Sequence, residues 1–262
     1  MRAFLAYFKV SITDALEYRG DILLYALSNV MLPVTSLLLW FAVTDSSSLS
    51  PLSRSEFVRY YLFLSVVGVW VSNWAAYFIS RDIRLGKMSA WIIKPASFIL
   101  YQAGNNISEK ILKTIYLIPI IITFGLIFQF SWPSLTLLKW IMFFVSVALA
   151  GILAFLIDVS TGLLAFWLDD SNAVREGYSI LHLVFSGRIV PLFTLPIVLQ
   201  QISTYLPFRY TLSLPLEIIL DKLSSLQLFQ GLLIQAFLVL AAFYLYKKLW
   251  RTGIKKYSAS GN

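Results

Sequence analysis

The sequence predicts an all-α polytopic membrane protein that crosses the bilayer six times. Apolar residues make up 59% of its 262 residues and charged residues 13%, and the mean hydropathy is +0.78. This composition lies outside the range of soluble globular domains. Several stretches carry no charge over about 18 residues or more, which is long enough for a helix to cross a hydrocarbon core of roughly 30 Å. The whole chain is therefore expected to form one transmembrane domain, residues 1–262.

The net charge and the absence of cysteine limit the kinds of partner and binding site that are expected for this chain. The 21 Lys and Arg exceed the 13 Asp and Glu, which gives a net charge of +8. Because the cations lie between apolar stretches, we interpret the excess as a topology signal and expect anionic lipid, not nucleic acid, as the partner. Fourteen Tyr and eight Trp fit aromatic belts at the membrane interfaces. The chain has no cysteine, so disulfides and thiolate metal sites are excluded.

Residues 1–21 are expected to form an amphipathic helix that lies in the membrane interface. Apolar side chains recur at every fourth position, at Phe4, Phe8, Ile12 and Leu16. Residues with this spacing share one face of a helix, and polar residues occupy the other faces. The alternative is that this segment is the solvated end of the first span.

Two membrane spans follow. The first is expected at Ile22–Thr44, a run of 23 uncharged residues. The second covers about Val58–Ser80 and comes after the polar, turn-rich loop Asp45–Pro51. Each is long enough to cross the bilayer as a helix, so the chain returns to its starting side after Ser80.

The stretch between the second and third spans, residues 81–105, is predicted to be a short helical docking element in the cytoplasm. It contains one acid, Asp82, and a loop with such an excess of cations faces the cytoplasm by the positive-inside rule. Gly86 permits a break after the second span, and Pro95 suits the first turn of a helix. Its four cations are Arg81, Arg84, Lys87 and Lys94. Its apolar residues suited to packing against a partner are Phe98, Ile99 and Leu100.

The third span is expected at about Ile111–Phe128, with the capping-box-like residues Asn106–Glu109 at the start of its helix. The fourth span lies within Trp140–Leu168, where Asp158 is the one charged residue. A carboxylate inside a membrane span is costly, roughly 2.5–3.5 kcal/mol on insertion scales, and is therefore a candidate for function. Asp158 is a candidate pathway residue; the alternative is a hydrogen bond that packs helices together.

After the polar turn Asp169–Glu176, a fifth span is expected from about Val174 to Ile189, and Leu226–Tyr246 forms the sixth. Residues 187–221 between them are apolar but too rich in proline for one continuous helix. We predict short re-entrant helices near the outer face, which are tolerated only where protein or a water-filled cavity shields them. The residues that mark the breaks are Gly187, Pro191, Pro196, Pro207 and Pro215, and the last short helix carries Glu217.

The distribution of cations predicts the orientation. Fifteen of the 21 Lys and Arg fall in segments on the side of the two termini, and six fall on the other side. The positive-inside rule then places both termini in the cytoplasm, as expected for a multi-pass protein of the cell (inner) membrane.

No catalytic residue or metal site is expected in this chain. The G-x-x-x-x-G-K-[S/T], H-E-x-x-H and G-x-S-x-G patterns are all absent, and His182 is the single histidine. His182 is a candidate pathway residue, with a packed or hydrogen-bonded interior residue as the alternative. Arg188 is a third candidate: it pairs with an acid or lines an outer cavity, or its side chain extends to the interface.

Three segments of the chain resemble the type-2 (export-class) permease subunits of ABC transporters, in particular the bacterial branch of about 260 residues. They are YRGDILLYALSNVMLP at the first span, the Gly86–Pro95 loop, and SGRIVPLFTLPIVLQQISTYLPFRYTLSLPLEIIL before the sixth. The resemblance implies six membrane helices and two permease subunits, identical or homologous, in each transporter. It also implies a separate cytoplasmic ATP-binding subunit that holds ATP and Mg, so no cofactor is expected on this chain.

The resemblance further implies that residues 81–105 carry the coupling helix and that the segment before the sixth span forms short helices near the outer face. It does not imply a substrate. Two other classes of function remain open at this stage. One is a proton-coupled secondary carrier that uses Asp158, and the other is a structural or assembly protein of the membrane.

Overall fold

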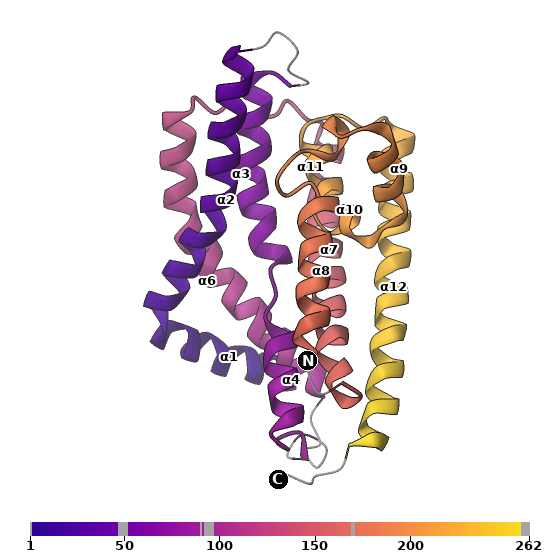
Figure 1. Cartoon of the computed structure of the whole chain (residues 1–262). Helices are drawn as coiled ribbons and strands as arrows, with labels where there is room; N and C mark the ends of the chain where they lie inside the picture. The colour runs from indigo at the N-terminus through magenta and orange to yellow at the C-terminus, as the bar shows by residue number, and fades with distance from the viewer. Residues whose placement is uncertain (1, 47–51, 90, 92–96, 169–170, 258–262) are drawn as a thin grey trace.

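The computed structural model describes residues 2–46, 52–89, 91, 97–168 and 171–257, and these residues contain helices and no strand. The long helices stand side by side, and the short helices α9, α10 and α11 gather at the upper end in the view of Figure 1. The helices are α1 (Arg2–Glu17), α2 (Arg19–Ser46), α3 (Arg54–Val71), α4 (Ala75–Arg84), α6 (Phe98–Ile127), α7 (Leu137–Leu163), η1 (Leu164–Phe166), α8 (Asn172–Phe185), η2 (Leu192–Thr194), α9 (Ile197–Tyr205), α10 (Pro207–Thr211), α11 (Ser213–Ile219) and α12 (Ser225–Lys256).

Among the described residues, five helical segments are long and apolar enough to cross a membrane. They are Gly20–Ala42, Arg54–Arg84, Phe98–Ile127, Leu137–Phe166 and Ser225–Lys256. The prediction of an all-helical multi-pass protein is thereby confirmed. The expected fifth span corresponds to α8, whose 14 residues extend about 21 Å at 1.5 Å per residue. Because α8 is shorter than a bilayer core, the count of six crossings stays a prediction.

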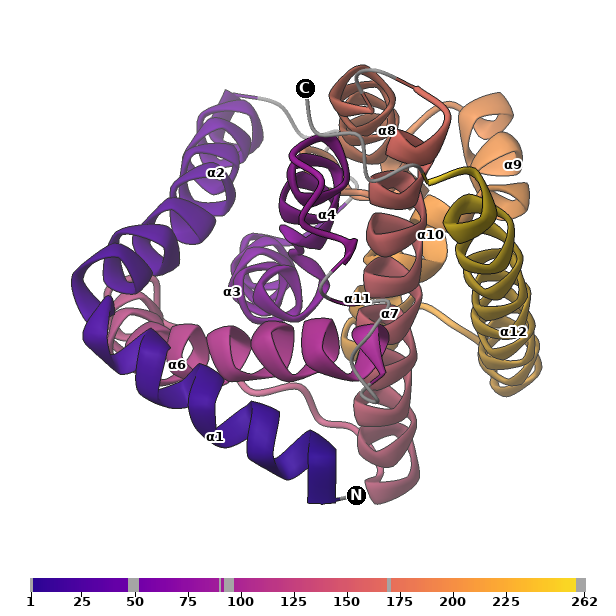
Figure 2. The same ribbon diagram turned by 90° about the horizontal axis from the view of Figure 1, so that it is seen from below.

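The amino-terminal helix α1 lies across the lower end of the bundle and packs on α6 (Figures 1 and 2). Ser11 is hydrogen-bonded to Asn105, and the Ser108 hydroxyl oxygen lies 3.3 Å from the Phe8 carbonyl oxygen. Leu16 is exposed, and the side chain of Phe4 lies outside the described part of the structure. The placement of α1 in a membrane interface stays a prediction.

The second span is not one continuous helix, which corrects the expectation for Val58–Ser80. Helix α3 ends at Val71, and α4 begins at Ala75. The three residues between them, 72–74, have a non-helical backbone. None of them is glycine or proline, so the local signal for this break is confined to Ser72 and Asn73, two short polar residues in an apolar run. Contacts with other helices maintain it, as described below.

The third span also begins earlier than expected. Helix α6 starts at Phe98, so Asn106–Glu109 lie inside the helix and do not cap it. Within it, the Ser108 hydroxyl donates to the Gly104 carbonyl at 2.9 Å, as serine often does in a helix interior. The predicted docking residues Lys94 and Pro95 lie outside the described residues.

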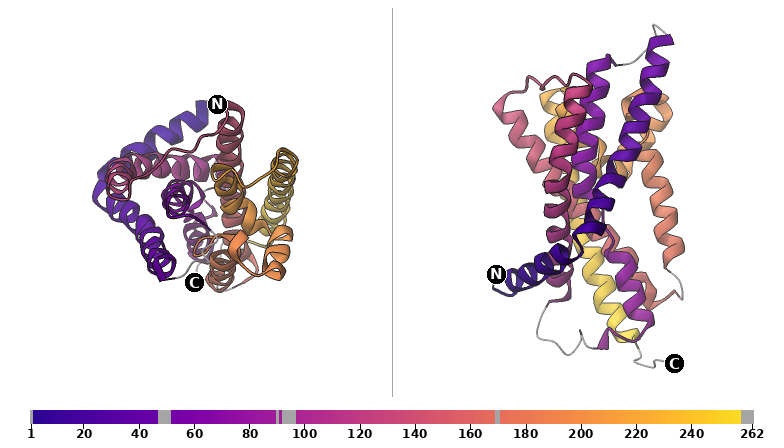
Figure 3. Two further views of the ribbon diagram at one scale, coloured as in Figure 1. Left: turned by 90° about the horizontal axis from the view of Figure 1, so that it is seen from above. Right: turned by 90° about the vertical axis from the view of Figure 1, so that its left-hand side faces the viewer.

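Helices α7 and α12 pack along each other and form the second half of the bundle (Figures 2 and 3). A glycine makes the close approach possible near their lower ends. A Cβ atom on Gly253 would lie 2.2 Å from Cδ2 of Phe166, so this position excludes a side chain. Gln235 of α12 donates to the Ser146 carbonyl of α7 at 3.0 Å and to the Tyr210 carbonyl at 2.7 Å. The amide thus holds α10 against both long helices.

The residues between α8 and α12 fold into η2, α9, α10 and α11 at the upper end of the bundle (Figure 1). Pro191 and Pro196 precede η2 and α9, and Pro207 is the first residue of α10. Proline suits the first turn of a helix because that turn lacks intrahelical partners for its N–H groups. Pro215 lies within α11, which is almost entirely buried. The depth of this segment in a membrane stays a prediction.

Candidate functional site

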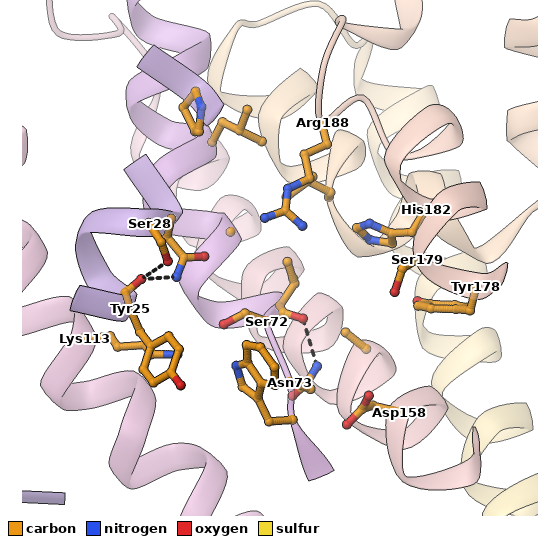
Figure 4. Close-up of a pocket in the computed structure, with 18 of the residues that line it drawn as sticks. Tyr25, Ser28, Ser72, Asn73, Lys113, Asp158, Tyr178, Ser179, His182 and Arg188 are labelled. Carbon is orange, nitrogen blue, oxygen red and sulfur yellow. Dashed lines mark hydrogen bonds between the residues drawn. The ribbon is translucent and has the colours of Figure 1, made fainter. Parts of the chain in front are cut away.

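A cavity of about 320 Å³ lies among the membrane helices, at the break between α3 and α4 (Figure 4). Its wall combines apolar residues of α2, α3 and α7 with an unusual number of polar and charged groups for such a position. The charged residues that line it are Lys113, Asp158, Arg175 and Arg188. The other polar and aromatic residues include Tyr25, Ser28, Asn29, Ser72, Asn73, Trp74, Tyr178, Ser179 and His182. The three predicted pathway residues, which are distant in sequence, therefore line one cavity.

Asp158 of α7 maintains the break in the second span. Its Oδ2 accepts a hydrogen bond of 2.9 Å from the backbone N–H of Ala76, in the first turn of α4. The first N–H groups of a helix lack intrahelical partners, and a carboxylate near them is also favoured by the helix dipole. Trp74, at the N-cap position itself, makes no side-chain capping bond. Asp158 thus replaces the missing cap from a different helix.

Asn73 connects the break to α6. Its Nδ2 donates to the Val71 carbonyl at 2.8 Å, which closes the end of α3. Its Oδ1 accepts from Nδ2 of Asn106 at 2.8 Å and from Nζ of Lys110 at 3.2 Å. The Lys110 side chain is buried in this position. The sequence prediction did not include Asn73 or Lys110, because Asn73 lies in an apolar run and Lys110 follows a basic loop.

Two cations of the wall have partners outside the cavity. Lys113 forms an ion pair with Glu109 one turn earlier on α6, and its Nζ lies 5.3 Å from the centroid of the Tyr25 ring. Arg175 pairs with Glu176 at 2.6 Å. The Nε of Arg175 is nevertheless buried without a hydrogen-bond partner among the described residues. The Arg175 guanidinium therefore keeps one buried N–H, at Nε, that donates no hydrogen bond to a described residue.

Arg188 follows α8, and its guanidinium points into the cavity (Figure 4). Its backbone is held on both sides. The Tyr60 hydroxyl donates to the Gly187 carbonyl at 2.6 Å, and the Tyr61 hydroxyl donates to the Ile189 carbonyl at 2.7 Å. Gly187 has a φ of +84°, a conformation that glycine adopts without strain. The chain can therefore turn at Gly187 after α8, and the role of this residue in a re-entrant segment stays a prediction.

His182 faces the same cavity from α8 (Figure 4). Its Nε2 lies 3.0 Å from the Thr211 hydroxyl at the end of α10, so it joins α8 to the segment of short helices. A hydrogen-bonded histidine was one of the two alternatives for this residue, and its position in the wall keeps the pathway role open. Among the described residues, no group of three or more His, Asp or Glu is placed to hold a metal ion.

The predicted docking segment has a well-defined beginning. Helix α4 ends in a Schellman motif: Gly86, with φ +70°, donates to the Ile83 carbonyl at 3.2 Å, and Lys87 donates to the Asp82 carbonyl at 2.9 Å. Beyond the undescribed residues, Phe98 is buried and stacks on Trp250 with ring centroids 4.9 Å apart. Of the predicted docking residues that the structure describes, Arg81, Arg84, Lys87 and Leu100 are exposed at the surface and Ile99 is half-buried.

An ion pair joins two of the short helices between α8 and α12. Arg209 of α10 contacts the Glu217 carboxylate of α11 through Nη2 at 2.7 Å and Nε at 3.3 Å, and the Ser213 hydroxyl donates to the same carboxylate at 2.9 Å. Burial lowers the pKa of the Arg209 guanidinium, but the adjacent Glu217 carboxylate more than offsets this, so the pKa lies above its usual value. Ion pairs also join Lys139 to Asp221 and, at 2.7 Å, Lys222 to Glu56.

Long apolar helices with a charged cavity among them define a multi-pass membrane protein of the transport class, because ionisable groups at membrane depth mark substrate or ion pathways. The family described as ABC-2 family transporter protein matches residues 30–261, nearly the whole chain. The chain therefore belongs to the ABC-2 transporter family, whose members are permease components of ABC transporters. A comparison with curated proteins found no match.

Proposed function

We propose that this chain is one of two permease subunits of an ABC exporter. With a second permease, identical or homologous, it forms the translocation pathway, and separate cytoplasmic subunits bind ATP and Mg and supply the energy. The observation that supports this proposal best is the family match over residues 30–261. The charged cavity is the part of the chain suited to a substrate, since ligand sites are concave and carry a few well-placed polar groups.

In this proposal the lower end of the bundle faces the cytoplasm in the cell (inner) membrane. Both the exposed cations at the end of α4 and the basic residues at the end of α12 lie at this end (Figure 1). Helix α8 is the fifth crossing. It is short because the chain turns at Gly187–Arg188, and Arg188 lines the cavity. The chain then crosses six times, and both termini lie in the cytoplasm.

Helix α4 connects the proposed docking surface to the cavity. It has ten residues, so it is about 15 Å long. Arg81 and Arg84 lie at its cytoplasmic end, while its first turn is bonded to Asp158 in the cavity wall. A movement that ATP binding imposes on the loop after α4 therefore reaches the cavity through one short, rigid element.

The experiment is affinity purification of the tagged chain from its native membrane, with mass spectrometry and ATPase assays on the eluate. We expect an ATP-binding subunit in the eluate of the unmodified chain. Leu85→Asp and Leu100→Asp place a charge on exposed residues at the cytoplasmic end, and we expect either to remove that subunit while the permease stays in the membrane.

Tyr205→Asp is the matched control, because Tyr205 is 87% exposed but lies in α9 at the opposite end. This variant should retain the ATP-binding subunit. Retention of the subunit by both Leu85→Asp and Leu100→Asp would contradict the docking assignment. An eluate of the unmodified chain without any ATP-binding subunit would contradict the proposed function.

A further inference from the structure

We propose that Arg188 binds an anionic group, a phosphate or carboxylate, of the transported substrate, and that the substrate also carries an apolar part. This inference rests on the proposed function in one respect, namely that the cavity belongs to the translocation pathway. The argument uses the charges of the wall, the way Arg188 is held, and the groups that surround it.

The wall carries more positive than negative charge. Three cations and one carboxylate line the cavity, and that carboxylate, Asp158, accepts a hydrogen bond from the α4 backbone. Lys113 and Arg175 have acidic partners, but Arg188 makes no side-chain hydrogen bond or ion pair with any described residue. A guanidinium offers five N–H donors, and one left unpaired among membrane helices is costly. An anionic ligand would supply the missing counter-charge.

The backbone on both sides of Arg188 is fixed before a ligand arrives. The Tyr60 and Tyr61 hydroxyls hold the carbonyls of the residues immediately before and after it, and both tyrosines are almost fully buried in α3. A fixed backbone reduces the conformational freedom that the residue loses on binding, which favours affinity. Arginine also presents a planar fork that matches the oxygens of a phosphate or carboxylate. These features suit Arg188 to bind an anion in the cavity.

The residues that line the cavity around Arg188 indicate the chemistry of the remainder of the ligand. Nε of Arg175 is a second buried donor without a partner among the described residues. Aromatic side chains of three different segments, Tyr25, Trp74 and Tyr178, offer faces for an apolar group. The volume of about 320 Å³ is near the lower end for small-molecule pockets. The cavity therefore fits the headgroup of an anionic amphiphile better than a whole large molecule.

The test measures binding to the full chain in nanodiscs of phosphatidylcholine, without any ATP-binding subunit. Trp74 lines the cavity, so tryptophan fluorescence reports on it, and Trp74→Phe identifies its share of the signal. The probes are dodecyl phosphate, inorganic phosphate and the neutral dodecyl glucoside. We expect saturable binding of dodecyl phosphate, at least tenfold weaker binding by Arg188→Gln, and an intermediate affinity for Arg188→Lys.

Arg59→Gln is the matched control, because it removes the same charge from a residue that bonds to Ser131 away from the cavity, and its affinity should be unchanged. If Arg188→Gln does not fold, Tyr61→Phe removes a bond that positions Arg188 without changing the charge, and weaker binding by this variant supports the site. Binding of inorganic phosphate that depends on Arg188 supports recognition of the free anion; binding of dodecyl phosphate alone supports an amphiphile.

Equal binding of dodecyl phosphate and dodecyl glucoside, or wild-type affinity of both Arg188→Gln and Tyr61→Phe, would overturn the proposal. This outcome is separate from that of the purification experiment. Absence of anion binding while an ATP-binding subunit still co-purifies removes the anion site and leaves the proposed function standing. Anion binding by a chain that co-purifies with no ATP-binding subunit supports the anion site and contradicts the proposed function.

Discussion

Asp158 has a structural task that its position in the sequence does not reveal. A lone carboxylate in an apolar span is costly, and the sequence is compatible with two roles for it, transport or packing. The structure gives its Oδ2 a defined partner, the N–H of Ala76 at 2.9 Å. This bond explains how the carboxylate is accommodated, and it places the group where the cavity meets the broken helix.

We expect Asp158→Asn to fold and to retain part of the transport activity, because the amide oxygen can still accept the bond from Ala76. Asp158→Ala removes the acceptor, and the loss of a helix cap typically costs about 1 kcal/mol. Thermal unfolding of the purified chain measures this loss, and Asp82→Ala, which removes a carboxylate with only a 3.8 Å contact to Arg81, is the control. Equal stability of Asp158→Ala and the unmodified chain would contradict the capping role. Complete loss of transport in Asp158→Asn at every pH would instead favour a proton carrier.

At the residue scale, the sequence identifies side chains that are unusual for their surroundings. Asp158, His182 and Arg188 stand out because each is alone in an apolar stretch, and the structure brings all three to one cavity. Asn73 and Lys110 could not be found in this way. Asn73 is uncharged, Lys110 follows a basic loop, and their significance depends on a hydrogen bond between residues 37 positions apart in sequence.

At the scale of elements, the half-helix α4 depends on close packing against α7. Gly162 of α7 faces the start of α4, and a Cβ there would lie 2.8 Å from the Ala76 Cα and 3.0 Å from its carbonyl oxygen. Both atoms belong to the backbone, so no rotation of a side chain can relieve the overlap. The absence of a side chain at this position therefore allows Asp158, one turn earlier, to reach the Ala76 N–H.

We expect Gly162→Ala to displace α4 from α7 and to reduce transport strongly, with a loss of stability of about 1–3 kcal/mol from overpacking. Gly177→Ala is the matched control, because a Cβ at Gly177 in α8 meets no atom within 4 Å. Alanine there should be neutral or stabilising. The measurements are thermal unfolding and transport in vesicles. Normal transport by Gly162→Ala would show that the α4–α7 contact can yield without loss of function.

The sequence predicts elements well where the chain itself carries the signal. Prolines mark the short helices between α8 and α12, and Gly86 ends α4 in the motif expected of a glycine at that position. The sequence does not identify the break at residues 72–74, because two short polar residues in an apolar run are a weak turn signal and further support comes from α6 and α7. The start of α6 was also placed too late, since a capping-like pattern occurred inside a helix that begins at Phe98.

At the scale of the whole molecule, the two largest apolar clusters among the described residues each join several helices. One joins α3 to α11 and the end of α2, and the other joins α4 to α7 and α12. The second membrane segment contributes its two halves to different clusters, and the link between them lines the cavity. Composition predicted a helical membrane protein, but the pairing of helices into two clusters depends on long-range packing that periodicity does not encode.

We expect single cysteines at Gln201 and Ser225 to be labelled from outside intact cells by a membrane-impermeant maleimide. Both residues are exposed at the upper end of the bundle, and the chain has no cysteine of its own. Arg84→Cys, at the end of α4, should be labelled only after the cells are permeabilised. Labelling of Ser225→Cys only after permeabilisation would mean that the number of crossings before α12 is even, either because α8 does not cross or because there is an additional crossing, and would exclude the six-span topology.

The break in the second membrane segment has a consequence for energy conversion. Ser72 and Asn73 bond locally to the Val69 and Val71 carbonyls, and Asn106, Lys110 and Asp158 of α6 and α7 supply the remaining bonds at the break. A ligand that draws Asp158 or Asn73 towards itself would compete with these bonds. Because the same link joins the cavity wall to α4 and the loop after it, a ligand in the cavity and a partner on that loop would act on one set of contacts, and by thermodynamic linkage each would bias the binding of the other.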